Sequence, residues 1–285
     1  ATADETEPEE VETDSNVRLW EGKTFDGYTM HILGRQDAAF AIDFEAEELT
    51  GEIVNDAVYN RNLKVEDDLE VTLEYVPHGG SHTQFLQDVR NSVTASDGAY
   101  DIVSSYAYYG SSLVQNNVLY NLHDIPNLTL TNSWFNQSFV SEMTVFDQLY
   151  FVVGDLTLTA TDRMFMFFYN KELANNWFPE VDLYDLVYEG GWTMDYMNNL
   201  ILDIYTDENG NGKRDGFDTY GFAFNTGSVP TDGFISSLRV RVAMKDEAGV
   251  PQITVYNDHV QSAYEKMIDL TYNNPGTGMG FGAMN

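Results

Sequence analysis

Oxygen-bearing residues recur at a regular spacing between Asp207 and Asp218, in the segment DENGNGKRDGFD. The oxygens would come from positions one, three, five, seven, nine and twelve: Asp207, Asn209, Asn211, the backbone carbonyl of Lys213, Asp215 and Asp218. Position six is Gly212, where a calcium loop of this length makes its sharp turn. Because Ca²⁺ takes six to eight hard oxygen ligands, the spacing predicts a calcium site that clamps the loop. A solvated Asn-Gly turn with spare acids is the alternative.

A second group of residues suits the binding of a small polar molecule. Tyr106, Tyr108 and Tyr109 follow a short β-prone run that ends near Val103, and Arg35 follows an earlier run of the same kind. Aromatic faces stack on the apolar face of a sugar ring, and arginine pairs with carboxylates or hydroxyls. Packing of the tyrosines, and an ion pair between Arg35 and one of the many acids, are equally open.

The elements that must position these tyrosines and Arg35 alternate between strand and helix spacing. The expected strands are 28–33, 70–76 and 100–103, and the expected helices are 47–61, 83–96 and 111–117. A β-α-β-α-β succession favours an α/β fold with a largely parallel sheet and helices on its faces. Ligands of such sheets bind beyond the carboxyl ends of the strands.

A second region begins near Gln137. Its expected strands are 149–153, 165–169, 220–224 and 253–256. Thr193 is the expected N-cap of one helix, and a last helix over 259–272 places Ala263, Met267 and Leu270 on its inner face.

Several short motifs follow one another in a fixed order along the chain. They are 97–103 (DGAYDIV), 118–122 (VLYNL), Trp134-Phe135, 148–152 (QLYFV), 168–173 (FYNKEL) and 183–197 (LYDLVYEGGWTMDYM). Together, over roughly Tyr28 to Tyr272, they resemble the family 1 extracellular solute-binding proteins of bacterial ABC transporters, which are similar to maltose-binding protein.

The resemblance implies a two-lobed, periplasmic-binding-protein-like fold of type II, which closes on its ligand by a hinge. We expect an acidic flexible tether over residues 1–24, the first lobe over 25–137 and the second lobe over 138–285. In this family the chain returns to the first lobe after the second. Here it ends while still in the second lobe, so we expect that lobe to be incomplete and the returning segment to be missing.

The resemblance also implies a function without chemistry. The protein would capture a small polar ligand, with a carbohydrate first in order, and deliver it as a monomer to the permease subunits of an ABC importer. An extracellular lipoprotein, held on the cell surface by an upstream lipid anchor, or a periplasmic protein would fit. The alternative is a calcium-dependent cell-surface glycan-binding or adhesion module without a transport role. An enzyme comes third. With 46 acids some carboxylate pair always lies at a suitable separation, so such a pair is no evidence for a glycoside hydrolase.

The resemblance implies ligand contacts in the loops that follow 100–103 and 220–224. Further candidates lie after the first strand and near the crossing into the second lobe, where Trp134 could fill the core instead. The expected ligand contacts are Arg35, Tyr106, Tyr108, Tyr109, Trp134, Asp155, Arg163, Asn225 and Asp232. We expect Trp177 in the core and Trp192 as the anchor of a helix start. In the calcium loop, Asp218 stands where the EF-hand pattern has Glu, which resembles the dockerin version of the loop.

Net charge and the lack of cysteine limit the classes of binding partner and of chemistry. The formal net charge is −32, with 14 basic residues, so the surface repels nucleic acids and anionic lipid headgroups. The chain has no cysteine, which excludes disulfides, thiol catalysis and thiolate metal sites.

Overall fold

The computed structural model describes residues 22–225 and 228–279, so the expected tether lies almost wholly outside the described residues. The chain divides into two compact units, one ending at Met164 and one beginning at Phe165. This division lies later than the lobe boundary expected after residue 137. Residues before Met164 stay with the first unit because Thr159 donates its backbone N–H (2.8 Å) and its hydroxyl (2.5 Å) to the buried carboxylate of Asp43.

The first unit is built on a three-stranded parallel sheet. Its strands are β1 (Tyr28–Arg35), β2 (Val71–His78) and β3 (Ile102–Val103), in the order β2-β1-β3. In the register, Leu33 lies opposite Val76 on one side and Val103 on the other. A mixed α/β unit with a parallel sheet flanked by helices is therefore confirmed.

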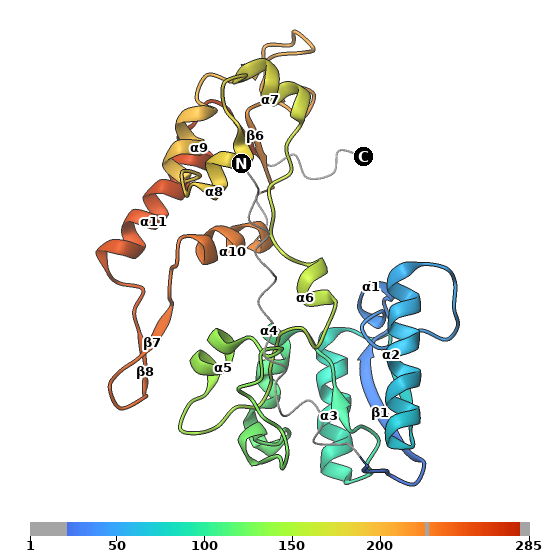
Figure 1. Cartoon of the computed structure of the whole chain (residues 1–285). Coiled ribbons are helices and arrows are strands. Elements are labelled where there is room, and N and C mark those ends of the chain that lie inside the picture. Colours follow the sequence, from blue (N-terminus) through green and yellow to red (C-terminus); the bar gives the residue numbers. More distant parts are fainter. Residues whose placement is uncertain (1–21, 226–227, 280–285) are drawn as a thin grey trace, which may run out of the picture. The chain divides into compact units, whose positions relative to one another are not determined.

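Helices cover both faces of this sheet. Figure 1 shows α2 (Ile53–Leu69) and α3 (His82–Ala95) on either side of β1. The expected helix over 47–61 begins only at Ile53, because the Glu52 side chain accepts from the N–H of Asn55 and caps it there. The shorter helices are α1 (Ala38–Ala41) and α4 (Ala107–Gly110), and α4 is followed by 3₁₀ turns at Ser111–Leu113 and Gln115–Asn117.

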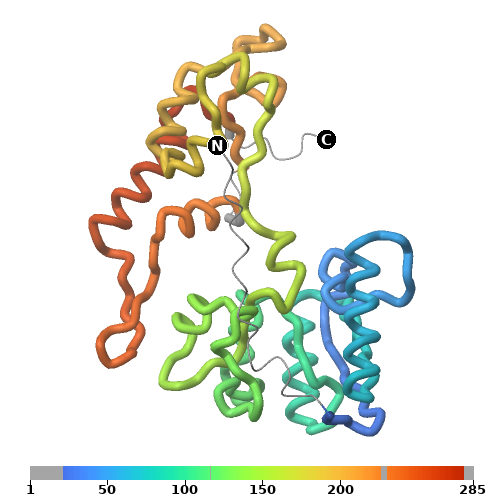
Figure 2. The backbone as a smooth tube through the Cα atoms, in the orientation of Figure 1, coloured from blue at the N-terminus to red at the C-terminus, as the bar shows by residue number. Residues whose placement is uncertain are grey.

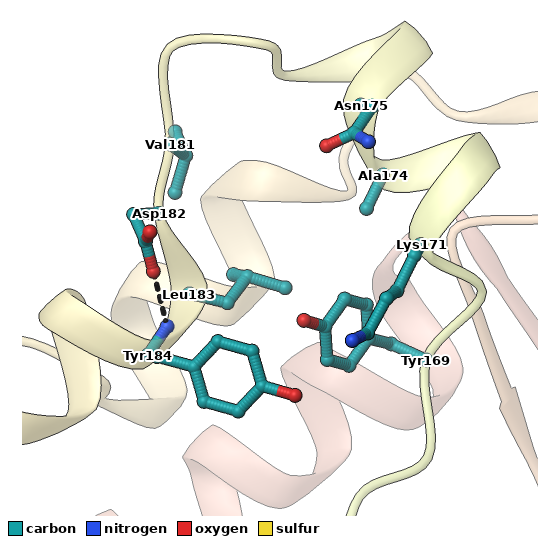
Figure 3. A pocket seen from close by; sticks show the side chains of 8 residues that line it. All are labelled: Tyr169, Lys171, Ala174, Asn175, Val181, Asp182, Leu183 and Tyr184. Carbon is teal, nitrogen blue, oxygen red and sulfur yellow. Dashed lines mark hydrogen bonds between the residues drawn. The ribbon is translucent and has the colours of Figure 1, made fainter.

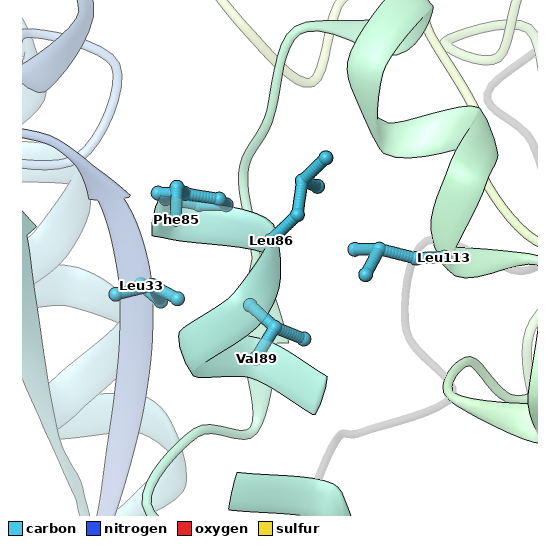
Figure 4. Packing of buried hydrophobic residues seen from close by; sticks show 5 residues of the cluster. All are labelled: Leu33, Phe85, Leu86, Val89 and Leu113. Atoms are coloured by element: carbon cyan, nitrogen blue, oxygen red, sulfur yellow. The ribbon is translucent and has the colours of Figure 1, made fainter. Parts of the chain in front are cut away.

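The core of the first unit lies between β1 and α3. Leu33 packs with four buried residues, as Figure 4 shows: Phe85, Leu86, Val89 and Leu113. Its neighbour Ile32 is also buried, on the opposite face of the strand, because successive side chains of a strand alternate. Continuous burial on both faces is typical of a parallel strand covered by helices.

Asp101, from the DGAYDIV motif, holds the amino-terminal half of β1. It accepts from the hydroxyl of Tyr28 at 2.6 Å and from the N–H of His31 at 2.8 Å. Burial acts to raise the pKa of Asp101, but these hydrogen bonds outweigh it and hold the pKa below its ordinary value of 3.8. The carboxylate thus stabilises the start of the sheet in its charged form.

Asp101→Asn should lower the free energy of unfolding by about 1–2 kcal/mol at pH 7, because it weakens two charge-assisted hydrogen bonds. A depressed folded-state pKa stabilises fully above the unfolded value near 3.8, and that stabilisation is lost as pH falls through the folded value. The difference in free energy of unfolding between the native protein and Asp101→Asn, measured in urea, should therefore shrink toward pH 3. Asp67→Asn, at an exposed helix position, is the control. A difference unchanged at pH 3 would contradict this account.

The rest of the first unit is mostly irregular. It contains a 3₁₀ turn at Leu122–Asp124, α5 (Gln137–Met143) and α6 (Thr159–Asp162) around a second core cluster of Leu130, Phe135 and Leu149. The strand expected over 149–153 is wrong. The Leu149 and Val153 carbonyls accept from Leu122 and Asn136, so they join turns instead of a ladder.

The second unit carries short strands and helices. Its helices are α7 (Lys171–Trp177), α8 (Leu183–Tyr188), α9 (Met194–Leu200), α10 (Ser228–Ser237) and α11 (Asp258–Ile268), the last continued by a π-helical turn at Asp269–Asn273. Its strands pair as β4 (Tyr205–Thr206) with β5 (Thr219–Tyr220), β6 (Phe222–Phe224) with β9 (Thr277–Met279), and β7 (Ala243–Lys245) with β8 (Pro251–Ile253). Figure 2 shows the β7–β8 hairpin in the chain between α10 and α11.

Helix predictions hold better than strand predictions in this unit. The Thr193 hydroxyl accepts from the N–H of Tyr196 and caps α9, and Ala263, Met267 and Leu270 are buried. The strand expected over 165–169 is wrong, since this extended segment joins no ladder among the described residues. The strand expected over 253–256 stops at Ile253. No described helix combines the length and the apolar character that a membrane crossing needs.

Candidate functional site

The carboxyl end of the parallel sheet brings Arg35 to the loop that follows β2. The Arg35 guanidinium donates to the Gly80 carbonyl and lies 3.5 Å from the Asp37 carboxylate, with only 18% of its side chain exposed. The Tyr75 hydroxyl donates to the Arg35 carbonyl at 2.6 Å, and burial raises the pKa of Tyr75 to about 12. Arg35 is therefore fixed by protein partners, as the ion-pair alternative anticipated, and it shapes the edge of the sheet.

Three tyrosines and a histidine form an open aromatic cluster at the same edge. We call Tyr106, Tyr108, Tyr109 and His82 the aromatic edge. The rings of His82 and Tyr109 stack at 4.2 Å with an interplanar angle of 13°, and Tyr108 meets Tyr109 edge-on at 5.1 Å. Tyr106 is 57% exposed and Tyr108 is 74% exposed. Rings held by one another but open to solvent can stack on a flat apolar ligand face.

His82 is the member of the aromatic edge that the sequence did not single out as a ligand contact. It is the first residue of α3, whose N-cap Ser81 accepts from the N–H of Gln84. The other histidine of this loop, His78, has both ring nitrogens engaged, one by Asp88 at 3.0 Å and one by the N–H of Gly80 at 3.1 Å. The signal for His82 was its place after a strand that ends at the same edge.

The other predicted contacts of the first unit, Trp134, Asp155 and Arg163, have partners outside the aromatic edge. Trp134 packs beside Phe135 on the second core cluster, and its carbonyl accepts from the N–H of Asp155 at 2.8 Å. The structure thus brings Trp134 and Asp155 together. Arg163 lies over the Phe40 ring at 5.1 Å and 3.3 Å from Asp162, so it already has protein partners.

The second unit holds an aromatic cavity of about 500 Å³. Segments 165–170 and 220–225 line it, together with parts of α7 and α10. Asn225, a predicted ligand contact, lies on its wall, whereas Asp232 is exposed on α10 and is not among its lining residues. Trp177, expected in the core, is instead 36% exposed at the last residue of α7 and lines the cavity.

A smaller hollow of about 170 Å³ lies between α7 and α8 (Figure 3). Tyr169 and Tyr184 meet edge-on at 6.0 Å, and the Lys171 ammonium lies 5.8 Å from the Tyr184 ring centre. The hydrogen bond from Tyr169 and the charge of Lys171 lower the pKa of Tyr184. The hollow is polar and small, which suits a water or a small ion better than a sugar.

The predicted calcium loop connects β4 to β5, and the pair of strands closes its two ends. The N–H of Gly212 donates to Asp207 Oδ2 at 2.8 Å, with Gly212 in the left-handed conformation at φ 71°. The N–H groups of Asn211 and Lys213 donate to the amide oxygens of Asn209 and Asn211, at 3.0 and 2.7 Å. The loop therefore wraps inward around its side-chain oxygens.

Two carboxylate oxygens inside this loop have no partner. Asp207 Oδ1 and Asp218 Oδ1 are inaccessible to solvent and accept no hydrogen bond. A buried carboxylate oxygen without a donor is costly, and a cation between such oxygens would remove the cost. The first and last positions of the loop thus fit Ca²⁺, which would neutralise their charge.

Other members of the expected ligand set fit less directly. Asp215 accepts from the Asn211 amide, from the N–H of Phe217 and from the Asn209 amide, and these hydrogen bonds lower its pKa. Across residues 22–225 and 228–279, no three His, Cys, Asp or Glu side chains converge on one point. A cation here would depend on amide and carbonyl oxygens, such as the Lys213 carbonyl, as well as carboxylates.

A scan with protein-family models found no match to this chain. Searches among curated proteins and among solved structures also found no match.

Proposed function

We propose that this chain is a solute-binding protein that captures a small polar ligand, with carbohydrate as the first class, for an ABC importer. The observation that carries the proposal is the aromatic edge at the carboxyl end of the parallel sheet. Its tyrosine rings are more than half exposed at Tyr106 and Tyr108 and are held by ring contacts. Sugar rings stack on such surfaces, and the nearby polar groups would read their hydroxyls.

The finer proposal is a two-lobed fold of the periplasmic-binding-protein-like type II. Support comes from the ordered motifs, from the parallel sheet of the first unit and from the division of the chain into two compact units. In that scheme the ligand stabilises one conformation of the protein, and the permease recognises this conformation. The protein performs no chemistry on its ligand. We place it outside the cytoplasm, as a lipoprotein at the cell surface or as a periplasmic protein.

A thermal-shift screen tests this proposal. The chain, in excess calcium, is heated with a panel of mono- and oligosaccharides, amino acids and short peptides. A ligand that binds only the folded state raises the melting temperature by mass action. At a hundredfold excess over Kd it adds about 2.7 kcal/mol to the free energy of unfolding. We expect a saturable rise with one class of sugar. A saturable rise with peptides alone would contradict the carbohydrate class, and no rise with any compound would contradict ligand capture.

The second candidate is a calcium-dependent surface module that binds glycans and feeds no transporter. The unpartnered oxygens of Asp207 and Asp218 favour it, because they point to a bound cation. In that case glycan binding would disappear when calcium is chelated. For the solute-binding protein we expect sugar binding to persist in chelator, since the aromatic edge belongs to the first unit and the loop to the second.

A further inference from the structure

We propose that the 207–218 loop binds one calcium ion through Asp207 and Asp218. We further propose that ion binding, through the contacts of Arg214, also stabilises the segment that leads into β9. The proposal does not depend on solute binding. It starts from the two buried oxygens, Asp207 Oδ1 and Asp218 Oδ1, which the protein itself leaves without a donor. Only oxygen ligands are available in the loop, which selects a hard cation.

Each of these carboxylates is held by its other oxygen. Asp218 Oδ2 accepts from the Tyr205 hydroxyl and from the N–H of Asp215, both at 3.0 Å. The Tyr220 hydroxyl reaches the same oxygen at 3.4 Å. Asp207 Oδ2 is held by the N–H of Gly212. With one oxygen of each group fixed, the free oxygens are oriented before the ion arrives, which lowers the entropy cost of binding.

Arg214 connects this loop to a distant part of the second unit. Its guanidinium carbon lies 4.0 Å from the ring centre of Tyr205 and 5.4 Å from that of Tyr220. The same guanidinium donates to the Pro275 carbonyl. Tyr205 and Tyr220 thus touch both the proposed ligand Asp218 and the arginine that reaches Pro275.

The segment beyond Pro275 is tightly packed. The Gly276 carbonyl accepts from the N–H of Phe222 at 3.1 Å, where β6 meets β9. A Cβ atom at Gly276 would lie 1.8 Å from the Ile201 carbonyl oxygen, so the segment passes directly against the backbone of Ile201, whose side chain belongs to the core of the second unit. When the 207–218 loop is ordered, Arg214 can therefore hold the segment around Pro275 and Gly276, which packs at the core of the second unit.

Terbium luminescence tests the site. Tb³⁺ bound in the loop would lie beside Tyr205 and Tyr220, which can sensitise its emission. We expect saturable emission on excitation of tyrosine, displaced by calcium. Tyr205→Phe with Tyr220→Phe should remove most of the emission, whereas Tyr256→Phe, at a 93% exposed position of the same unit, should not. Emission that does not saturate, or that survives loss of both tyrosines, would overturn the site.

Charge-matched variants separate a built site from general attraction to an acidic surface. Asp207→Asn and Asp218→Asn should each weaken calcium at least tenfold in the displacement titration. Glu208→Gln removes the same charge from the loop, but its side chain accepts from the Thr219 hydroxyl and is not a proposed ligand, so we expect less than about a twofold change. Equal effects of all three variants would overturn the assignment. If the aspartate variants unfold, terbium emission from the tyrosine variants still tests whether the loop binds the ion.

Hydrogen exchange tests the connection through Arg214. In the native sequence, calcium should slow exchange at Gly212 and Asp215 in the loop and also at Phe222 in β6. In Arg214→Ala the loop amides should keep their protection while the calcium effect at Phe222 is lost. Arg239→Gln, which removes a positive charge from an exposed position of the same unit outside the loop, should behave like the native protein. Protection confined to the loop in the native protein would overturn the connection and leave only the metal site.

Discussion

Leu33→Ala should lower the free energy of unfolding of the first unit by about 2–5 kcal/mol, the cost of deleting a fully buried leucine from a close-packed core. Leu33 is 1% exposed and contacts α3 through Phe85, Leu86 and Val89. Its strand is also the central one of the sheet, so the cavity would lie between β1 and the helix that covers it. Urea unfolding followed by circular dichroism measures the loss.

The matched control is Leu49→Ala, since Leu49 is 58% exposed in the same unit. Exposed positions of this kind change stability by about 0.5 kcal/mol or less. A Leu33 variant as stable as the Leu49 variant would mean that β1 and α3 do not form the core of this unit.

Tyr108→Ala should weaken the best sugar ligand about tenfold, equivalent to about 1.4 kcal/mol, because a stacking face is removed. Tyr106→Ala should act in the same direction. Both side chains are more than half exposed, so the melting temperature of the free protein should stay nearly unchanged. Isothermal titration of the variants with the sugar measures the effect.

Tyr120→Ala provides the control for these variants. Tyr120 is 85% exposed in the same unit and has no ring contact with the aromatic edge. It should leave the affinity within about twofold. Loss of affinity in the Tyr120 variant, with none at Tyr106 or Tyr108, would move the ligand away from the edge of the sheet.

The sequence predicted those helices and strands whose apolar residues recur at a regular helix or strand spacing. The parallel strands of the first unit, α3 and α11 carry regular apolar patterns, and Thr193 caps α9 as its side-chain chemistry requires. Strands over 149–153 and 165–169 failed for the opposite reason. A β-prone run becomes a strand only if a partner lies beside it, and this is a tertiary fact that composition does not contain.

The candidate sites divide in the same way. The 207–218 loop is a local motif, so its turn at Gly212 could be predicted from spacing alone, whereas calcium binding by Asp207 and Asp218 stays a prediction. The hydrogen bond from Arg35 to the Gly80 carbonyl and the stacking of His82 on Tyr109 depend on which strands are neighbours. The sequence placed Arg35 and the three tyrosines at one edge, but it did not place His82 there and could not say which side chains would remain open to a ligand.

Binding without turnover is the central claim, and one experiment tests it most directly. The chain is titrated with the best sugar from the screen by calorimetry, and the sugar is then recovered and compared with the starting material by chromatography. We expect one ligand per chain, a negative heat-capacity change from apolar burial, and sugar that is chemically unchanged. Cleaved or modified sugar, or heats that never saturate, would contradict the account.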